Sequence, residues 1–289
     1  MIESISPAPA WPPYEVLMPL APWEEPVVVA EALASLAVQQ PAPKRLVLSV
    51  DGALPAPLQQ VVQAMAGLPI LVLSGPGGEG VAIVLARGLA ACGCELILRA
   101  DADDLSLPDR AARQLAWLDQ HPEVVAGSGW IEEFVADPAQ GVVACRRVPL
   151  DGAVVPWARW RNPLNHPAVA LRRSAVLAVG SYRHQPGFED YDLWLRLLRR
   201  YGPRALNNLP VVLVAARVGP AHLARRRGLR YARQEVQFLL RSAREGQLGW
   251  GQALLLLLLR LPWRLLPARW LAKLMDLIRH YPHDRQRAG

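Results

Sequence analysis

The chain of 289 residues has little cysteine, few aromatic residues and no long run of apolar residues. Its three cysteines are too few for a disulfide framework, and Cys92-Gly93-Cys94 lacks the second pair that a zinc site needs, so we expect reduced, mostly buried thiols. The apolar run 253–259 is far shorter than the ~20 residues that span a bilayer. No basic segment followed by an apolar core opens the chain, so we expect no secretory signal and a cytosolic protein.

Positive charge is concentrated in the last quarter of the chain. From Arg217 onward there are 15 basic and 4 acidic side chains, an excess of +11, which leaves −4 for residues 1–216 of a chain with net charge +7. Anionic lipid and nucleic acid both suit such a tail, and a GC-rich genome also favours arginine. Trp263 and Trp270 alternate with leucine and arginine there, which is typical of a helix in the membrane interface. We therefore expect an anionic membrane surface as partner and no nucleic acid; the alternative is two helices that pack on the domain or across a dimer.

The hydrophobic pattern predicts alternating strands and helices after a disordered lead-in over residues 1–13. We expect strands at 14–18, 45–50, 70–73 and 96–100, and helices at 27–40, 58–65, 81–92 and 109–121. Further strands are expected at 124–135, 141–148 and 210–218, with helices at 191–200 and 229–242. The first strands are continuous apolar runs, which is typical of strands buried on both faces. The sequence thus predicts an α/β fold with a mostly parallel sheet, flanked by helices on both faces.

Three carboxylates follow the expected strand 96–100, at Asp101, Asp103 and Asp104. Helix capping would explain one acidic residue here but not three. Because ligands of such sheets bind beyond the carboxyl ends of the strands, a divalent cation that bridges carboxylate and phosphate oxygens suits this position. In an extended segment, side chains two residues apart point the same way, so Asp101 and Asp103 would both face the ligand-binding cleft beyond the strand ends.

Three other motifs allow a structural and a functional interpretation. The glycine-rich loop 75–80 lacks the Gly-Lys-Ser/Thr ending of a phosphate-binding loop, and we interpret it as a turn between strand and helix. His166, in Asn-His-Pro, suits a hydrogen-bonded histidine in a turn. The acidic residues of Phe-Glu-Asp-Tyr-Asp, at positions 189, 190 and 192, either stabilise a helix N-terminus or supply a general base.

Taken together, these segments resemble one known family. The order and spacing of the segments 99–110, 161–169 and 188–194 are highly specific, and Val50-Asp51-Gly52 and 216–219 agree with them. The chain resembles family 2 glycosyltransferases of the GT-A fold, in particular the bacterial exopolysaccharide and lipopolysaccharide branch that includes the amylovoran-type enzymes. The resemblance covers the chain from about residue 16 to the tail, and it implies a GT-A domain over 14–220 and a basic amphipathic helical tail over 221–289.

The resemblance also implies a role for particular residues. Pro19, Asp51 and Asp101 would lie at the donor nucleotide, a UDP- or dTDP-sugar. Asp103 would hold Mg²⁺ or Mn²⁺ on the diphosphate. Asp190 would take the proton from the acceptor hydroxyl, and family members of this type invert the anomeric configuration. Residues 166 and 189, a histidine and a glutamate, would lie near the acceptor, a polysaccharide or lipid-linked glycan of cell-surface polysaccharide biosynthesis. The enzyme would then work as a peripheral protein at the inner face of the cytoplasmic membrane.

Several positions depart from the family pattern on the donor side. They are Ala21 in place of a tyrosine-containing turn, Val50 in place of a first acidic residue, Gly78 and Ala86 in place of asparagines, and Ala216 in place of a tyrosine. These departures motivate an alternative function, a catalytically impaired subunit that binds a sugar nucleotide within a polysaccharide assembly complex.

Overall fold

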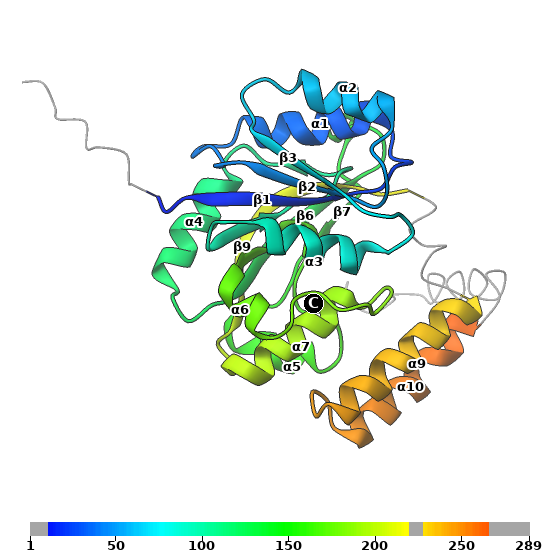
Figure 1. Cartoon of the computed structure of the whole chain (residues 1–289). Coiled ribbons are helices and arrows are strands. Elements are labelled where there is room, and N and C mark those ends of the chain that lie inside the picture. Colours follow the sequence, from blue (N-terminus) through cyan, green and yellow to red (C-terminus); the bar gives the residue numbers. More distant parts are fainter. Residues whose placement is uncertain (1–10, 220–227, 266–289) are drawn as a thin grey trace, which may run out of the picture. The chain divides into compact units, whose positions relative to one another are not determined.

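The computed structural model describes residues 11–219 and 228–265, and the chain divides between residues 219 and 220 into two units (Figure 1). The first ten residues of the expected lead-in, the junction 220–227 and the tail beyond residue 265 lie outside the described residues. The assignment of the two units as a catalytic domain and a tail stays a prediction.

The first unit is an α/β fold built on one mixed sheet of nine strands. The strands are β1 (Tyr14–Leu20), β2 (Leu46–Val50), β3 (Ile70–Ser74), β4 (Leu96–Arg99), β5 (Leu105–Ser106), β6 (Ala126–Phe134), β7 (Ala144–Arg146), β8 (Ala170–Arg172) and β9 (Leu206–Arg217). The helices are α1 (Pro26–Ala37), α2 (Ala56–Ala64), α3 (Val81–Ala91), α4 (Arg110–Gln120), α5 (Val154–Ala158), α6 (Arg173–Ala178) and α7 (Glu189–Tyr201), with 3₁₀ turns η1 (Pro138–Gln140), η2 (Asp151–Ala153) and η3 (His166–Ala168). The predicted fold class is confirmed.

The sheet has the order β3-β2-β1-β4-β8-β6-β9-β5, with β7 paired to β6. The first four strands are parallel, as expected from their helical crossovers. The short strand β8 then pairs antiparallel with both β4 and β6. The sequence pattern does not predict β5 or β8, because two or three residues show no periodicity. It is nevertheless β8 that joins the first half of the sheet to the second half.

Hydrophobic cores lie on both faces of the sheet, with α1 and α2 on one side and α3 on the other (Figure 1). Successive side chains of a strand point to opposite faces. Val16 and Met18 of β1 therefore join the core beneath α1, while Leu17 between them packs with α3, in the core to which α7 also contributes. Trp194 of α7 is fully buried in the second core. Burial on both faces explains why β1, β2 and β4 are mostly apolar.

Two expectations about the strands are wrong. Strand β1 continues through Pro19 to Leu20, where a stop before Pro19 was predicted. Strand β1 pairs with β4 only over residues 14–17, so Pro19 has a paired neighbour in β2 but none in β4. The N–H group that proline lacks therefore removes no hydrogen bond between β1 and β4. Strand β3 is only partly buried, because it lies at the edge of the sheet.

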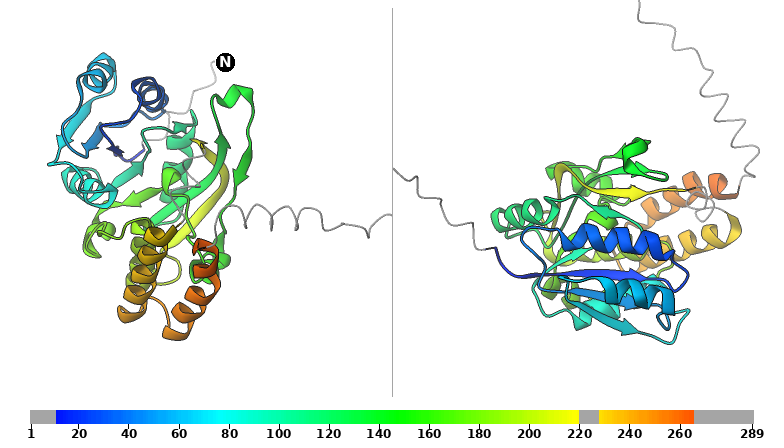
Figure 2. Two further views of the ribbon diagram at one scale, coloured as in Figure 1. Left: turned by 90° about the vertical axis from the view of Figure 1, so that its right-hand side faces the viewer. Right: turned by 90° about the horizontal axis from the view of Figure 1, so that it is seen from above.

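The second unit contains two helices, α9 (Gly228–Arg244) and α10 (Trp250–Leu265), joined by a short turn. They lie side by side and form a hairpin (Figure 2). The expected helix over 229–242 is confirmed as part of α9, and the apolar run 253–259 is part of α10. Among the described residues no helix has both the length and the apolar composition that crossing a membrane requires.

Candidate active site

The acidic motif forms a tight turn between β4 and β5. The carboxylates of Asp101, Asp103 and Asp104 each offer an oxygen, and these atoms all lie within 4.8 Å of one another. The prediction that Asp101 to Asp103 form an extended segment is wrong, since residues 102 and 103 form a turn. Because of the turn, Asp104 joins the other two carboxylates instead of pointing away from them. We call Asp101, Asp103 and Asp104 the acidic turn.

Oxygen ligands at this spacing suit a hard divalent cation. Burial, together with the neighbouring charges of Asp101 and Asp103, raises the pKa of Asp104 well above its usual range. A bound cation would relieve this repulsion. One oxygen of Asp104 also accepts a hydrogen bond from the backbone N–H of Arg217 at 2.8 Å, which ties the acidic turn to the end of β9. The residues present therefore fit Mg²⁺ or Mn²⁺.

A buried arginine lies next to the acidic turn. Arg99, the last residue of β4, pairs with Asp101 and is 4% exposed. Its carbonyl oxygen accepts a hydrogen bond of 2.5 Å from Arg110 of α4. Burial, followed by the charge of Arg99, lowers the pKa of Arg110 to about 10. Arg99 and Arg110 are the two ends of the segment 99–110, but the sequence indicated no role for either, because their contacts with Asp101 and with each other form only in the fold.

Asp190 lies at the start of α7 with both carboxylate oxygens hydrogen-bonded. One oxygen accepts the backbone N–H of Tyr191 at 2.7 Å, and the other accepts the side-chain amide of Asn162 at 2.5 Å. Asn162 precedes η3 by four residues, within a segment that the sequence analysis noted only as part of a family pattern. The carboxylate of Asp190 is thus held in one orientation by two donors from different segments.

The remaining acceptor-side candidates lie in a partly buried polar cluster. The His166 ring nitrogen is 3.1 Å from the Tyr182 hydroxyl, so the expected hydrogen-bonded histidine in a turn is confirmed. Burial, then the charge of Arg99, lowers the pKa of His166 well below its usual value, which favours a neutral ring. Burial, then the charge of Asp190, raises the pKa of Glu189 to about 7. Tyr182 is a further member that the sequence did not indicate.

This cluster and the acidic turn lie close together in the fold. Arg99 donates its backbone N–H to the carbonyl of Val169 at 2.9 Å, which places the segment after His166 against the end of β4. The Tyr182 hydroxyl lies within electrostatic range of Asp101, Glu189 and Asp190, and burial raises its pKa above the usual value. Segments about 90 residues apart in the sequence therefore converge around Arg99 and Tyr182.

Asp51 and Pro19 lie at the ends of the neighbouring strands. Both oxygens of Asp51 accept backbone N–H groups of the glycine-rich loop, from Glu79 at 3.0 Å and Gly80 at 3.2 Å. The loop is the turn that was expected, with positive φ at Gly77, Gly78 and Gly80. Because Asp51 already occupies the N–H groups before α3, these are less available to a phosphate. Pro19 pairs in register with Ser49 inside the sheet.

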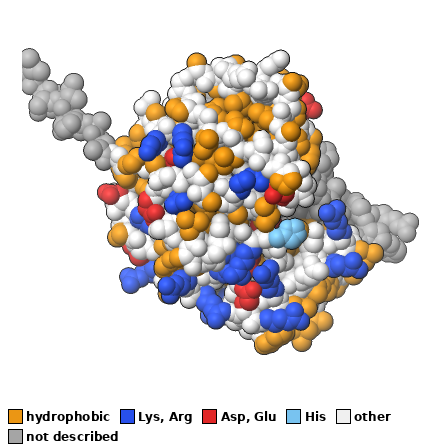
Figure 3. All heavy atoms as spheres, viewed as in Figure 1, with side chains coloured by type: hydrophobic (Ala, Val, Ile, Leu, Met, Phe, Trp, Pro, Cys, Tyr) orange, Lys and Arg blue, Asp and Glu red, His pale blue; other side chains and the backbone are white. Residues whose placement is uncertain are grey.

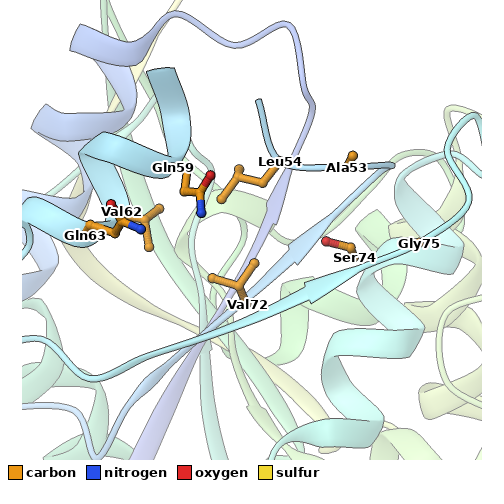
Figure 4. A pocket seen from close by; sticks show the side chains of 8 residues that line it. All are labelled: Ala53, Leu54, Gln59, Val62, Gln63, Val72, Ser74 and Gly75. Atoms are coloured by element: carbon orange, nitrogen blue, oxygen red, sulfur yellow. The ribbon is translucent and has the colours of Figure 1, made fainter. Parts of the chain in front are cut away.

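A separate hollow of about 460 Å³ lies between α2 and the edge strand β3 (Figure 4). Side chains of Gln59, Val62 and Gln63 line it from α2, and those of Val72 and Ser74 line it from β3. None of the candidate site residues lines this hollow, so we do not assign the site to it.

Comparison with known proteins gives the family context of this arrangement. The family model described as glycosyl transferase family 2 matches residues 23–178. The chain is 33% identical over 275 residues, 94% of its length and 99% of the relative's, to the amylovoran biosynthesis glycosyltransferase AmsE of Erwinia amylovora. It is 30% identical over 258 residues, 89% of its length and 92% of the relative's, to a UDP-Gal:alpha-D-GlcNAc-diphosphoundecaprenol beta-1,3-galactosyltransferase of Escherichia coli.

A solved structure shares the fold. The mannosyltransferase PcManGT of Pyrobaculum calidifontis, in complex with GDP-Man and Mn²⁺, superposes with a TM-score of 0.66 at 21% identity. The match covers 96% of this chain and 84% of that one. At this identity the likeness supports the GT-A fold and says nothing of the donor.

Proposed function

The chain belongs to glycosyl transferase family 2, and from this premise we propose that it transfers a sugar from a nucleotide-sugar donor, with inversion, in bacterial cell-surface polysaccharide biosynthesis. The observation that carries the proposal is the convergence of the acidic turn with the hydrogen-bonded Asp190 around Arg99 and Tyr182. The acidic turn suits the leaving diphosphate, and Asp190 suits the attacking hydroxyl.

On the donor side, Asp103 would hold Mg²⁺ or Mn²⁺, with Asp101 and Asp104 close enough to share the cation. A cation held there would supply positive charge to the leaving nucleoside diphosphate. Arg99 fixes Asp101 by its ion pair. Asp51 holds the glycine-rich loop at the end of β3 and, with Pro19, would lie beside the nucleoside of a UDP- or dTDP-sugar.

On the acceptor side, Asp190 would accept the proton of the acceptor hydroxyl. The hydroxyl oxygen forms a bond to the anomeric carbon as the bond from that carbon to the diphosphate oxygen breaks, and attack opposite the leaving group inverts the configuration. Asn162 and the N–H of Tyr191 leave Asp190 in a fixed orientation for this transfer. Glu189 and His166 would line the acceptor pocket beside it.

Two exposed tryptophans extend the acceptor side. Trp157 of α5 and Trp160, which follows α5, are 38% and 46% exposed and shortly precede Asn162. Indole rings stack on the apolar faces of sugars while their N–H groups bond to hydroxyls. These rings would hold the non-reacting sugars of a glycan acceptor. The printed name of the Escherichia coli relative specifies a diphosphoundecaprenol-linked acceptor, and by analogy we propose a lipid-linked acceptor here.

A lipid-linked acceptor would require the enzyme to work at the cytoplasmic face of the membrane. Residues 220–289 carry 14 basic and 4 acidic side chains, an excess of +10 that would be attracted to anionic lipid. We therefore propose a peripheral enzyme whose second unit keeps the first unit near its acceptor.

Donor turnover by the purified protein tests the reaction. With Mn²⁺ present, a panel of nucleotide sugars is screened for hydrolysis and transfer, and nucleotide binding is measured by calorimetry. Asp190→Asn should abolish transfer and spare donor binding, whereas Asp103→Asn should abolish transfer and weaken metal-dependent donor binding. Asp109→Asn is the matched control, since Asp109 is exposed and forms a local ion pair with Arg113. Absence of both turnover and metal-dependent nucleotide binding would rule out the proposal.

The alternative of a binding subunit without activity is favoured by one observation. Both oxygens of Asp51 are already hydrogen-bonded to the loop, and this loop carries the family departure at Gly78. Full donor binding with no turnover for any acceptor tested would support this alternative.

A further inference from the structure

Helix α10 directs its charged side chains inward, toward α9. Glu235 of α9 is fully buried and accepts hydrogen bonds from Arg260 at 3.0 Å and Arg264 at 2.9 Å. The Arg264 guanidinium also lies 4.7 Å from the centre of the Tyr231 ring. Both arginines of the described part of α10 are thus used to hold the hairpin together.

The opposite face of α10 is apolar and exposed. It is formed by two adjacent rows of side chains at four-residue spacing, and we call it the outer stripe: Trp250, Leu254, Leu255, Leu258, Leu259 and Trp263. Their exposed fractions range from 42% to 65%. Residues four apart lie on the same side of a helix, so the rows form one continuous surface. Hydrophobic side chains gather on the surface of the hairpin that is in view in Figure 3.

This arrangement differs from that of an ordinary surface helix. Such a helix turns its apolar stripe to the core and its charges to water. Here the buried side of α10 includes Arg260 and Arg264 beside Ala253 and Leu256, while the four leucines of the outer stripe are exposed. A contiguous apolar patch of this kind on a soluble protein usually marks an interaction surface.

The charge of the second unit distinguishes between the possible binding partners of the outer stripe. A second copy would bring another unit with an excess of +10, and the two units would repel one another. An anionic bilayer would attract each unit instead. The two tryptophans lie at the ends of the stripe, and tryptophan favours the boundary between lipid and water. The pattern therefore favours lipid over a second copy.

We propose that the outer stripe of α10 inserts into the interface of an anionic phospholipid bilayer, while Glu235 keeps Arg260 and Arg264 on the protein side of the helix. The proposal specifies how the peripheral enzyme proposed above would contact the membrane. It rests on the proposed function only for its biological setting. It assigns the membrane-contacting surface to specific side chains, and it separates insertion by the stripe from attraction by the other basic residues of the unit.

Vesicle binding by the full-length protein tests this. Co-sedimentation is measured with phosphatidylcholine vesicles that contain or lack phosphatidylglycerol, for the wild type and for Leu254→Glu/Leu258→Glu. Because the two leucine side chains would lose their apolar contact with the bilayer, the variant should bind phosphatidylglycerol vesicles at least about tenfold more weakly. Val27→Glu/Val38→Glu is the matched control, because these valines are 71% and 59% exposed in the first unit. The control should bind like the wild type.

Three results would overturn the proposal. They are no binding of the wild type to phosphatidylglycerol vesicles, equal binding by the stripe variant, and a vesicle-free dimer that the stripe variant dissociates. Circular dichroism verifies folding, and a milder Leu254→Gln/Leu258→Gln variant replaces the first if it fails to fold. Manganese-dependent nucleotide binding is measured on the same samples. A stripe variant that loses vesicles but keeps nucleotide binding separates this proposal from the enzymatic one.

Discussion

The side-chain amide of Asn162 lies 2.5 Å from the carboxylate of Asp190, so a residue outside the acidic motifs orients the proposed base. The second oxygen of Asp190 is bonded to the backbone of its own helix. The orientation of this carboxylate therefore depends on the packing of the segment before η3 against α7.

We expect Asn162→Ala to lower kcat between about tenfold and a hundredfold, because a base that is held less firmly transfers protons less efficiently. The KM for the donor should stay near the wild-type value, since Asn162 bonds to Asp190 and not to the acidic turn. Steady-state kinetics at saturating acceptor measures both. Asn207→Ala removes another hydrogen-bonded asparagine, on β9, and should leave kcat unchanged. A parallel rise in the donor KM would indicate general damage to the fold.

Arg217 fixes the acidic turn through its side chain as well as its backbone. Its guanidinium bonds to the carbonyl oxygens of Asp103 at 3.3 Å and Ala136 at 2.5 Å, to Glu31 at 2.6 Å, and lies 4.7 Å from the Phe134 ring centre. We expect Arg217→Ala to destabilise the first unit by about 2 kcal/mol and to weaken Mn²⁺-dependent nucleotide binding.

Thermal unfolding with and without Mn²⁺ and nucleotide measures both effects. The control Arg113→Ala removes an exposed arginine that pairs only with Asp109, and its unfolding should resemble the wild type's. If Arg217→Ala unfolded earlier yet gained the same thermal shift from ligand, Arg217 would matter for stability alone.

The raised pKa of Glu189 makes stability depend on pH. Its pKa is about 7 in the fold and near 4.5 when unfolded, so the folded state binds the extra proton between these values. The stabilisation that protonated Glu189 contributes is complete below about pH 4.5, and it is lost as the pH rises through about 7. Glu189→Gln replaces the carboxyl group with an amide that is neutral at every pH. At pH 8 we therefore expect the variant to be more stable than the wild type by about 1 to 3 kcal/mol.

Denaturant unfolding of both proteins at pH 5 and pH 8 measures this difference. The advantage of the glutamine variant should shrink at pH 5, where Glu189 is mostly protonated. Glu123→Gln, the same substitution at an exposed position, serves as the control. An advantage of equal size at both pH values would contradict the titration of Glu189.

Close packing of α3 on the sheet depends on Gly88. A β-carbon there would lie 2.4 Å from a methyl of Leu17 and 3.1 Å from the Cβ of Ser49. Gly88→Ala should therefore destabilise the first unit by about 1 to 3 kcal/mol, despite the higher helix propensity of alanine. Gly152→Ala, at a position with open space around it, should have little effect in the same unfolding experiment.

The sequence by itself determined the order of most strands and helices and the position of the acidic residues at strand ends, because these follow from local apolar periodicity and chain direction. It also carried the family resemblance, since motif order and spacing are properties of the chain. It could not give the short strand β8, whose pairing with β4 and β6 is between residues far apart in sequence.

Only the tertiary structure decided how the candidate site is assembled. A turn in place of an extended segment brings Asp104 beside Asp101 and Asp103, and a buried arginine from β4 pairs with Asp101. Similarly, the composition of α10 indicated an amphipathic helix, but only its packing on Glu235 showed that Arg260 and Arg264 face inward and the leucines of the outer stripe face outward. Local pattern determines which residues share a helix face, whereas long-range packing determines what that face contacts.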